Sequence, residues 1–334
     1  MNSSEHRSDA IVLGHPSRPT LLGHIQIARL DHWVKNVFVL PGVVVALSID
    51  PQPVIVGLPL RFIVGLLAIG LIASSNYVIN EVMDAPFDRY HPLKRLRPVP
   101  SGRVSIPLAY VEWIVLMIAG LGIAWTVSGP FAATLLALWL MGCIYNLPPI
   151  RSKDVPYVDV VSEAINNPLR MLAGWYIASN NLRVPFSLLF SYWLIGCYFM
   201  AMKRLAECEE IGDPSRAARY RKSFSFYTRE RLLVAIMFYG SAAMLLFGAF
   251  IMRYRLELIA SFPVVALIMA LYLKLAFKPD SPVQHPEKLH REPVLMGAIC
   301  ACVALMAALL FYDIPILYDL FPPAVPITHG ALFR

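Results

Sequence analysis

Three oxygen-bearing side chains recur at four-residue intervals where a long apolar stretch of the chain ends. Asn80, Asp84 and Asp88 therefore lie on one face if the segment is helical. Two carboxylates and an amide suit Mg²⁺, which commonly completes its coordination with the phosphates of a substrate. The spacing predicts a Mg²⁺ site formed by Asn80, Asp84 and Asp88, with the two aspartates as catalytic residues. Pro86 removes a helical hydrogen bond, so we expect the helix to kink or end near it.

Cationic side chains follow these acids directly. The loop after Asp88 contains His91, Lys94, Arg95 and Arg97, which are predicted to bind phosphate oxygens. The alternative is a solvated loop whose cations serve only the topology of a membrane protein. The close alternation of acids and cations exceeds what topology requires and favours a site.

A polar stripe also enters the otherwise apolar segment 158–178. Asp159, Glu163 and Arg170 share helical spacing with Asn166 or Asn167. An acid within a membrane span costs roughly 3 kcal/mol unless it faces a cavity or a partner. We therefore predict catalytic roles for Asp159 and Glu163 in a cavity. The alternative is a Glu163–Arg170 ion pair that only holds helices together.

Further polar residues at the ends of apolar segments complete the candidate phosphate-binding set. Near residue 203, cations and acids with helical spacing precede a basic amphipathic stretch that contains several aromatic residues. That stretch is predicted either to lie on the membrane surface as a lid over the site or to be a plain surface helix. The residues in this set are Tyr145 and Lys153 before the polar stripe, and Lys203, Arg204 and Glu207 after it.

Composition sets the class of protein that must position these side chains. Hydrophobic residues make up 57% of the 334 residues, charged residues only 15%, and the mean hydropathy is +0.59. An ordinary soluble domain carries roughly 25% charged residues. The composition therefore excludes a soluble enzyme, a disordered chain and a nucleic-acid-binding domain. It predicts an all-α polytopic membrane protein, because lipid leaves helices as the only spanning structure when strand alternation is absent.

Nine apolar segments are predicted to be membrane-spanning helices, which need about 20 residues each. Twenty-two of the 29 Lys and Arg residues lie in the N-terminal segment and in alternate loops, and only four lie on the opposite side. Because such cations stay cytoplasmic, the N-terminus is predicted inside and the C-terminus outside the plasma membrane. The predicted spans are 36–49, 54–79, 105–127, 130–145, 158–178, 185–202, 231–252, 256–277 and 293–312.

These spans divide the chain into three parts. Residues 1–20 are polar and have a composition compatible with disorder, residues 21–313 form the transmembrane domain, and residues 314–334 form an apolar, non-cytoplasmic tail. Nearly every carboxylate lies in a cytoplasmic loop. The net charge of +7 therefore reports membrane orientation and is not evidence for a nucleic-acid partner.

Nine helices with an NxxxDxxxD motif at the end of the second resemble the UbiA superfamily of intramembrane prenyltransferases. Four segments are similar to the phosphoribosyltransferase branch of that superfamily: ARLDHWVKNVFVLPG (28–42), DRYHPLKRLRPVPSG (88–102), the YN…K…P…DV pattern from Tyr145 to Val160, and MKRLAE (202–207). The aromatic prenyltransferases carry a second Asp-rich motif after the sixth helix, where this chain has Lys203, Arg204, Glu207 and Glu210. The resemblance implies a nine-helix bundle with a central cavity open to the cytoplasmic side.

The resemblance to the phosphoribosyltransferase branch also implies a reaction. A Mg²⁺-dependent enzyme would transfer a phosphoribosyl group from phosphoribosyl pyrophosphate to a polyprenyl phosphate and release pyrophosphate. Asp159 or Glu163 would position a ribose hydroxyl or a second metal. Lys35 and Asn36, in the first similar segment, join the predicted phosphate-binding residues.

Two other functions stay open. The first is a UbiA-type prenyltransferase that joins a polyprenyl diphosphate to an aromatic or other small acceptor. The second, more remote, is a transporter of an anionic solute, whose polar site would lie near the membrane midplane between inverted repeats. Here the acids gather on one side, and no clear repeat is present. Both transferase hypotheses need a polyprenyl lipid, a soluble diphosphate-bearing or small co-substrate and the membrane, and neither involves nucleic acid.

Overall fold

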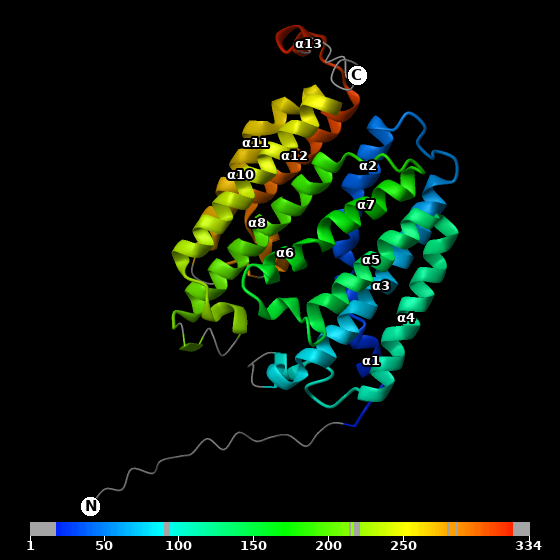
Figure 1. Cartoon of the computed structure of the whole chain (residues 1–334), viewed down its shortest axis with the longest axis vertical. Coiled ribbons are helices and arrows are strands. Elements are labelled where there is room, and N and C mark those ends of the chain that lie inside the picture. Colours follow the sequence, from blue (N-terminus) through cyan, green and yellow to red (C-terminus); the bar gives the residue numbers. More distant parts are fainter. Residues whose placement is uncertain are drawn as a thin grey trace, which may run out of the picture.

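The computed structural model describes residues 18–89, 94–213, 215–216, 221–278, 281–284 and 286–322. Every regular element in these ranges is a helix, and the long helices run side by side along the bundle (Figure 1). The α-helices are α1 (Leu21–Ile27), α2 (Leu40–Ile49), α3 (Leu58–Asp88), α4 (Ile106–Val127), α5 (Gly129–Asn146), α6 (Val158–Ala164), α7 (Asn166–Ala178), α8 (Phe186–Ile211), α10 (Arg229–Tyr254), α11 (Phe262–Ala276), α12 (Pro293–Phe311) and α13 (Pro315–Leu320). The 3₁₀ helices are η1 (Leu30–Val39), η2 (Lys94–Leu96), η3 (Ser152–Asp154), η4 (Lys222–Ser225), η5 (Leu256–Ser261) and η6 (Pro286–Arg291).

Eight helical units in the described residues are long and apolar enough to cross a membrane. The first of them, Leu21–Ile49, joins α1, η1 and α2, and the others are α3, α4, α5, α8, α10, the unit Leu256–Ala276, and α12. Large apolar side chains such as Trp125, Met237 and Leu245 are exposed on the outside of these helices. Lipid, and not water, is the solvent that such a surface fits. The prediction of an all-α polytopic membrane protein is confirmed.

The predicted span 158–178 differs from the expected single helix. It consists of α6 and α7, which are separated at Ile165. Pro168 has no N–H to bond to the carbonyl of Ala164, so the α-helical ladder is interrupted at this turn. The last carbonyls of α7 accept hydrogen bonds from Arg61 on the first turn of α3. The α6–α7 pair thus runs toward the N-terminal end of α3, and a ninth crossing, made by a broken helix, stays a prediction.

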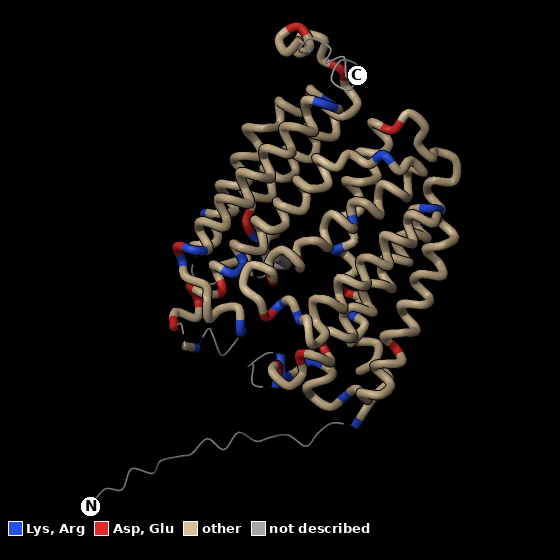
Figure 2. Tube along the Cα trace, in the orientation of Figure 1, with Lys and Arg blue, Asp and Glu red and all other residues tan. Residues whose placement is uncertain are grey.

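Charged residues gather at one end of the bundle, as the sequence predicts. Figure 2 shows most Lys, Arg, Asp and Glu residues at the end where α3, α5 and α8 finish, with few at the opposite end. The first described helix, α1, lies at the charged end and α13 lies at the other (Figure 1). We refer to these as the charged end and the far end.

Two glycines let α7 approach the first helical unit at backbone distance. A Cβ added at Gly42 would lie 1.8 Å from the carbonyl oxygen of Met171, and one added at Gly174 would lie 2.0 Å from that of Val39. Small residues at such a crossing allow van der Waals packing of backbones, which is a main source of helix association in membranes. The crossing fixes where η1 lies against the start of α7.

Replacing Gly174 by alanine is expected to destabilise the protein, because no side-chain movement relieves a contact with backbone. Overpacking of this kind costs about 1–3 kcal/mol. The midpoint of thermal unfolding in detergent should fall. Gly122→Ala is the matched control, since nothing lies within 4 Å of a Cβ there. Equal midpoints for the two variants would show that this crossing is not tight.

Candidate functional site

The end of α3 carries the predicted metal ligands on one helical face. The helix continues through Pro86 and ends at Asp88. The predicted end of the helix near the proline is therefore observed, two residues after Pro86. Asn80 and Asp84 are half-buried, and Asp88 is buried. The helical spacing assumed from the sequence therefore holds along the whole motif.

Asn80 and Asp84 belong to one network that joins α3, α5 and η3. Asp84 Oδ1 accepts hydrogen bonds from Lys153 Nζ and, at 3.1 Å, from Arg151 Nη2. The Oδ1 atom of Asn146 accepts from Lys153 Nζ at 2.9 Å and from Asn80 Nδ2 at 2.6 Å. We call these five residues the Asp84 network. Its carboxylate is held between two cations from one loop.

Burial gives the Asp84 network its electrostatic character. Lys153 is buried, and this desolvation lowers the pKa of its ammonium group, while the charge of Asp84 and its hydrogen bond oppose the shift. Arg151 enters the network from a backbone with φ of +32°, a conformation unfavourable for a residue with a side chain. Such strain costs roughly 1–3 kcal/mol and tends to occur at functional sites. Arg29 and Tyr157 are further described non-glycine residues with positive φ.

Asp88 faces a different loop. Its Oδ2 atom accepts a hydrogen bond of 2.6 Å from Arg97 Nη1, and Glu81 on the same helix accepts one of 2.9 Å from the Val99 backbone. These contacts fold the loop after η2 against α3. Arg95 is exposed and Lys94 is half-buried, and the structure therefore brings Arg97, but not Arg95, to an acid of the motif.

The three predicted metal ligands fit Mg²⁺ by donor type. Asn80 donates through Nδ2, Asp84 accepts through Oδ1 and Asp88 through Oδ2, so within the described residues each keeps one oxygen out of these contacts. Those oxygens are hard donors of the kind that Mg²⁺ takes from proteins. No group of three or more His, Cys, Asp or Glu side chains at metal-binding spacing occurs in the part of the chain that the structure describes. The donor set is therefore one amide and two carboxylates.

A second cluster surrounds Asp159. This side chain is fully buried, and its Oδ2 atom accepts from Arg204 Nε at 2.9 Å and from Ser223 Oγ at 3.3 Å, while Tyr227 donates to Oδ1. Arg204 is 2% exposed and also donates to Glu207 Oε2 at 2.8 Å. We call these residues the Asp159 cluster. It joins α6, α8 and the segment that contains η4.

One side of the segment 221–227 packs against the bundle, whereas Lys222, Ser225 and Phe226 on the other side are exposed. Ser223, Phe224 and Tyr227 are buried, and Tyr227 accepts a 2.7 Å hydrogen bond from the backbone N–H of Tyr157. Ser223 and Tyr227 contact Asp159 on α6, and Phe224 lies beside Arg204 of α8. The lid remains a prediction, because residues 214 and 217–220 of the basic stretch, like His91 near the metal motif, lie outside the described residues.

Arg221 connects the Asp159 cluster to the Asp84 network. Its Nη2 atom donates to Tyr145 Oη at 2.8 Å, its Nε atom donates to the Lys153 carbonyl at 3.3 Å, and Asp159 Oδ2 lies 3.8 Å from Nε. Burial and the nearby Arg204 oppose its charge, yet the tyrosine and the acids around it raise its pKa. Burial and Asp159 likewise raise the pKa of Tyr227. Arg221 therefore stays cationic in the wall of the site.

A third set of charged residues is carried by η1, α6, α7 and α8. The charges of Glu163, Lys203, Arg29 and Arg170 all act on Lys35. Glu163 and Arg170 form no ion pair within the described residues, so the alternative of a simple helix-locking pair is not observed. Asn36 is buried, and its Oδ1 atom has no hydrogen-bond partner among the described residues.

Several contact residues were missed from the sequence. Asn146 shares its oxygen between Asn80 and Lys153, Arg221 bridges two clusters, and Tyr227 bonds Asp159. Asn146 follows Tyr145 directly, and that adjacency was an available signal. Arg221 lies in a basic run that the positive-inside rule explains on its own, so no separate signal marked it.

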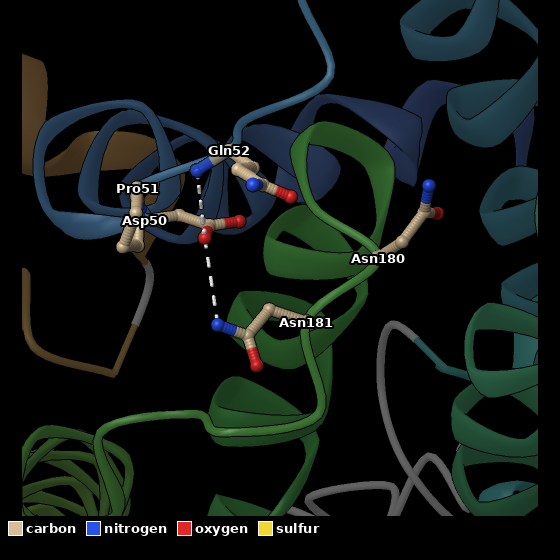
Figure 3. Close-up of a pocket in the computed structure, with 5 residues that line it drawn as sticks. All are labelled: Asp50, Pro51, Gln52, Asn180 and Asn181. Carbon is tan, nitrogen blue, oxygen red and sulfur yellow. Dashed lines mark hydrogen bonds between the residues drawn. The ribbon is translucent and has the colours of Figure 1, made fainter.

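A pocket of about 480 Å³ lies at the far end of the bundle, away from the predicted site residues. Figure 3 shows its lining, which comes from the segments that follow α2 and α7. Asp50 accepts hydrogen bonds from the Gln52 backbone at 3.2 Å and from Asn181 Nδ2 at 3.4 Å, and Ser179 donates to its other oxygen. These bonds tie two loops together. The cytoplasmic opening of a central cavity stays a prediction.

The described part of the chain is an all-helical bundle with membrane-spanning lengths, and its acids and cations meet at one end. The model of the UbiA prenyltransferase family matches residues 35–290, and the chain belongs to this family. It is a transferase of that family, as the sequence motifs predicted.

The relatives include enzymes of the predicted branch. The decaprenyl-phosphate phosphoribosyltransferase of Mycobacterium tuberculosis H37Rv is 31% identical over 242 residues, which cover 71% of this chain and 76% of the relative. That of Mycolicibacterium smegmatis is 29% identical over 256 residues, with 74% and 76% covered. Among solved structures, a UbiA homolog from Archaeoglobus fulgidus bound to GPP and Mg²⁺ superposes with a TM-score of 0.64 at 19% identity, covering 87% of this chain and 100% of that one. This likeness supports the fold.

Proposed function

We propose that the protein transfers a phosphoribosyl group from phosphoribosyl pyrophosphate to a polyprenyl phosphate, with Mg²⁺ as cofactor and pyrophosphate as the second product. The named relatives support this substrate pair. The observation that carries the proposal lies on α8. Where the aromatic enzymes of the family have a second Asp-rich motif, this chain has Lys203 and Arg204, and Arg204 is already paired with Asp159 and Glu207. Glu207 is taken up by Arg204, which leaves Lys203 as the cation of this motif with no hydrogen bond or ion pair among the described residues, and a cation suits an acceptor that carries a phosphate.

The Asp84 network would bind the donor. Asn80, Asp84 and Asp88 would hold Mg²⁺, and the bound metal would neutralise charge on the leaving pyrophosphate. Lys153 and Arg151, which already lie against Asp84, would donate to the diphosphate oxygens as negative charge builds up on them. The bond from ribose C1 to the pyrophosphate oxygen breaks, and its electron pair leaves with the pyrophosphate. A phosphate oxygen of the lipid then bonds to C1, and because that phosphate is ionised, no general base is needed.

Asp159 and Glu163 would differ in role. The contacts of Asp159 are taken up by Arg204, Ser223 and Tyr227, so we propose that it positions the wall that carries Arg221. Glu163 makes no hydrogen bond through its carboxylate to any described residue. It is therefore the better candidate to accept a hydrogen bond from a ribose hydroxyl.

The charged end would face the cytoplasm of the cell, where a soluble donor is available. The positive-inside rule supports this orientation in the plasma membrane, with the C-terminal segment 314–334 on the other side. A lipid acceptor would reach the same site from the bilayer. The proposed cavity open to the cytoplasm would bring the two substrates together.

Pyrophosphate release from two substrate mixtures tests the proposal. Purified protein with Mg²⁺ receives either phosphoribosyl pyrophosphate and polyprenyl phosphate, or polyprenyl diphosphate and 4-hydroxybenzoate. We expect release only in the first mixture. Release only in the second would favour the aromatic prenyltransferase, and release in neither would favour a transporter.

Removing the metal is expected to stop the reaction reversibly. Dialysis against EDTA should reduce pyrophosphate release to background, because the two carboxylates of the motif would then repel the diphosphate. Added Mg²⁺ should restore the rate, and an equal concentration of K⁺ should not. Undiminished release after exhaustive chelation would contradict the metal assignment.

A further inference from the structure

Two cations lie near the tight crossing of α7 with the first helical unit. Val39 and Gly174 are in backbone contact, and so are Gly42 and Met171. Lys35 and Arg170 each lie about one helical turn before this crossing, on η1 and α7 respectively. Two separate contact points fix the crossing, so the neighbourhood of these cations is set by backbone packing.

Cations outnumber acids in this neighbourhood. Lys35 is acted on by three cations, Arg29, Arg170 and Lys203, and by one acid, Glu163. Lys203 forms no hydrogen bond or ion pair with any described residue. The Nε atom of Arg170 is buried without a partner among those residues, and its Nη1 atom reaches only the Asn166 carbonyl, at 3.5 Å. Lys35 Nζ lies 3.4 Å from His32 Nδ1, whereas Lys203 and the Nε atom of Arg170 keep unused donors. Neighbouring cations with unused donors are unfavourable unless an anion joins them.

We infer that Lys35, Arg170 and Lys203 form a metal-independent subsite for the phosphate group of the lipid acceptor, an inference that rests on the proposed function. The three side chains come from η1, α7 and α8 and supply donors without a carboxylate pair to hold a metal. A guanidinium and two ammonium groups suit the oxygens of a monoester phosphate. The donor diphosphate would have its own carboxylates and cations in the Asp84 network.

The surroundings of the subsite fit a lipid better than a free phosphate ion. The guanidinium carbon of Arg29 lies 5.9 Å from the centre of the Tyr77 ring on α3, so an aromatic side chain lies beside these cations. On η1, Val34, Val37 and Phe38 are exposed. An isoprenoid chain can therefore leave the subsite along an apolar surface of the same helix that supplies Lys35.

Separate binding measurements on the two substrates test this inference. Binding of a short polyprenyl phosphate in the presence of EDTA, and of phosphoribosyl pyrophosphate in the presence of Mg²⁺, is measured by native mass spectrometry of the purified full-length protein. Arg170→Gln and Lys35→Gln should each weaken polyprenyl phosphate binding roughly tenfold or more, the effect of one charge-assisted contact. They should leave the donor affinity within about twofold. Asp84→Asn should show the opposite pattern.

Controls separate the subsite from general charge effects. Arg253→Gln removes one exposed cation at the far end and should change neither affinity. Arg170→Lys should retain part of the lipid affinity that Arg170→Gln loses. Because Lys35 is exposed, its variant reports on binding even if Arg170→Gln folds poorly.

Three results would overturn the inference. The first is an unchanged affinity for polyprenyl phosphate in both Arg170→Gln and Lys35→Gln. The second is polyprenyl phosphate binding that requires Mg²⁺. The third is inorganic phosphate competing for the site as well as polyprenyl phosphate does. Failure of the proposed function looks different. The protein would then bind polyprenyl phosphate through these cations and yet release no pyrophosphate from phosphoribosyl pyrophosphate.

Discussion

Asp84→Asn is expected to abolish turnover while the protein stays folded. Asp84 is the carboxylate that both Lys153 and Arg151 contact, and it lies one turn from Asn80 in the predicted metal motif. The variant keeps the shape of the side chain but removes the charge that a divalent cation requires. Loss of metal-assisted charge stabilisation, worth several kcal/mol, should lower kcat roughly a thousandfold. Initial rates of pyrophosphate release at saturating substrates measure this.

A carboxylate at the same end provides the matched control. Glu210 on α8 is exposed, and Glu210→Gln removes the same charge without touching the Asp84 network. Its rate should stay within about twofold of the wild-type protein, since exposed charges contribute little. A near-normal rate for Asp84→Asn would mean that the metal site has been assigned to the wrong residues.

Arg204→Met is expected to destabilise the protein strongly. The substitution leaves the fully buried Asp159 without its closest cation and removes the partner of Glu207. Removing one partner of a buried ion pair costs about 3–5 kcal/mol. The free energy of unfolding, measured by denaturant titration in detergent, should fall by that amount. The sequence predicted a phosphate-binding role for Arg204, whereas the proposal here is that it is a buried structural residue.

The neighbouring cation separates the two roles. Lys203→Met removes a charge one residue earlier on α8 that forms no hydrogen bond or ion pair with the described residues, so the free energy of unfolding should change little. Adding Asp159→Asn to Arg204→Met should recover part of the lost stability, because the uncompensated acid is then gone. Wild-type stability with a raised KM in Arg204→Met would restore the phosphate-binding role.

The helices were predictable because lipid permits little else. The predicted span 105–127 corresponds closely to α4. At the end of α3 the helix continues through Pro86, so Asn80, Asp84 and Asp88 keep their helical spacing. The break in 158–178 was not predicted, although Pro168 was visible in the sequence. The polar stripe was read as one continuous helix face, and a turn at Ile165 instead separates Asp159 and Glu163 from Arg170.

The partners of the buried acids could not be predicted. Asp159 is bonded to Arg204 and Tyr227, which are 45 and 68 residues away in the sequence. Spacing rules reach only neighbours on one helix, so an acid that holds three segments together looks the same as an acid that faces a substrate. The role of Arg221 in joining the two clusters could not be predicted either, because the positive-inside rule already explained the basic run in which it lies.

The most direct test of the account follows a labelled ribose. Protein in nanodiscs receives phosphoribosyl pyrophosphate labelled in the ribose ring, a polyprenyl phosphate and Mg²⁺, and the extracted lipid is analysed by mass spectrometry. The account predicts a lipid product that carries the labelled phosphoribosyl group, formed in amounts equal to the pyrophosphate released and absent with Asp84→Asn. Pyrophosphate release with no label in the lipid, or a lipid product that forms equally well with Asp84→Asn, would contradict it.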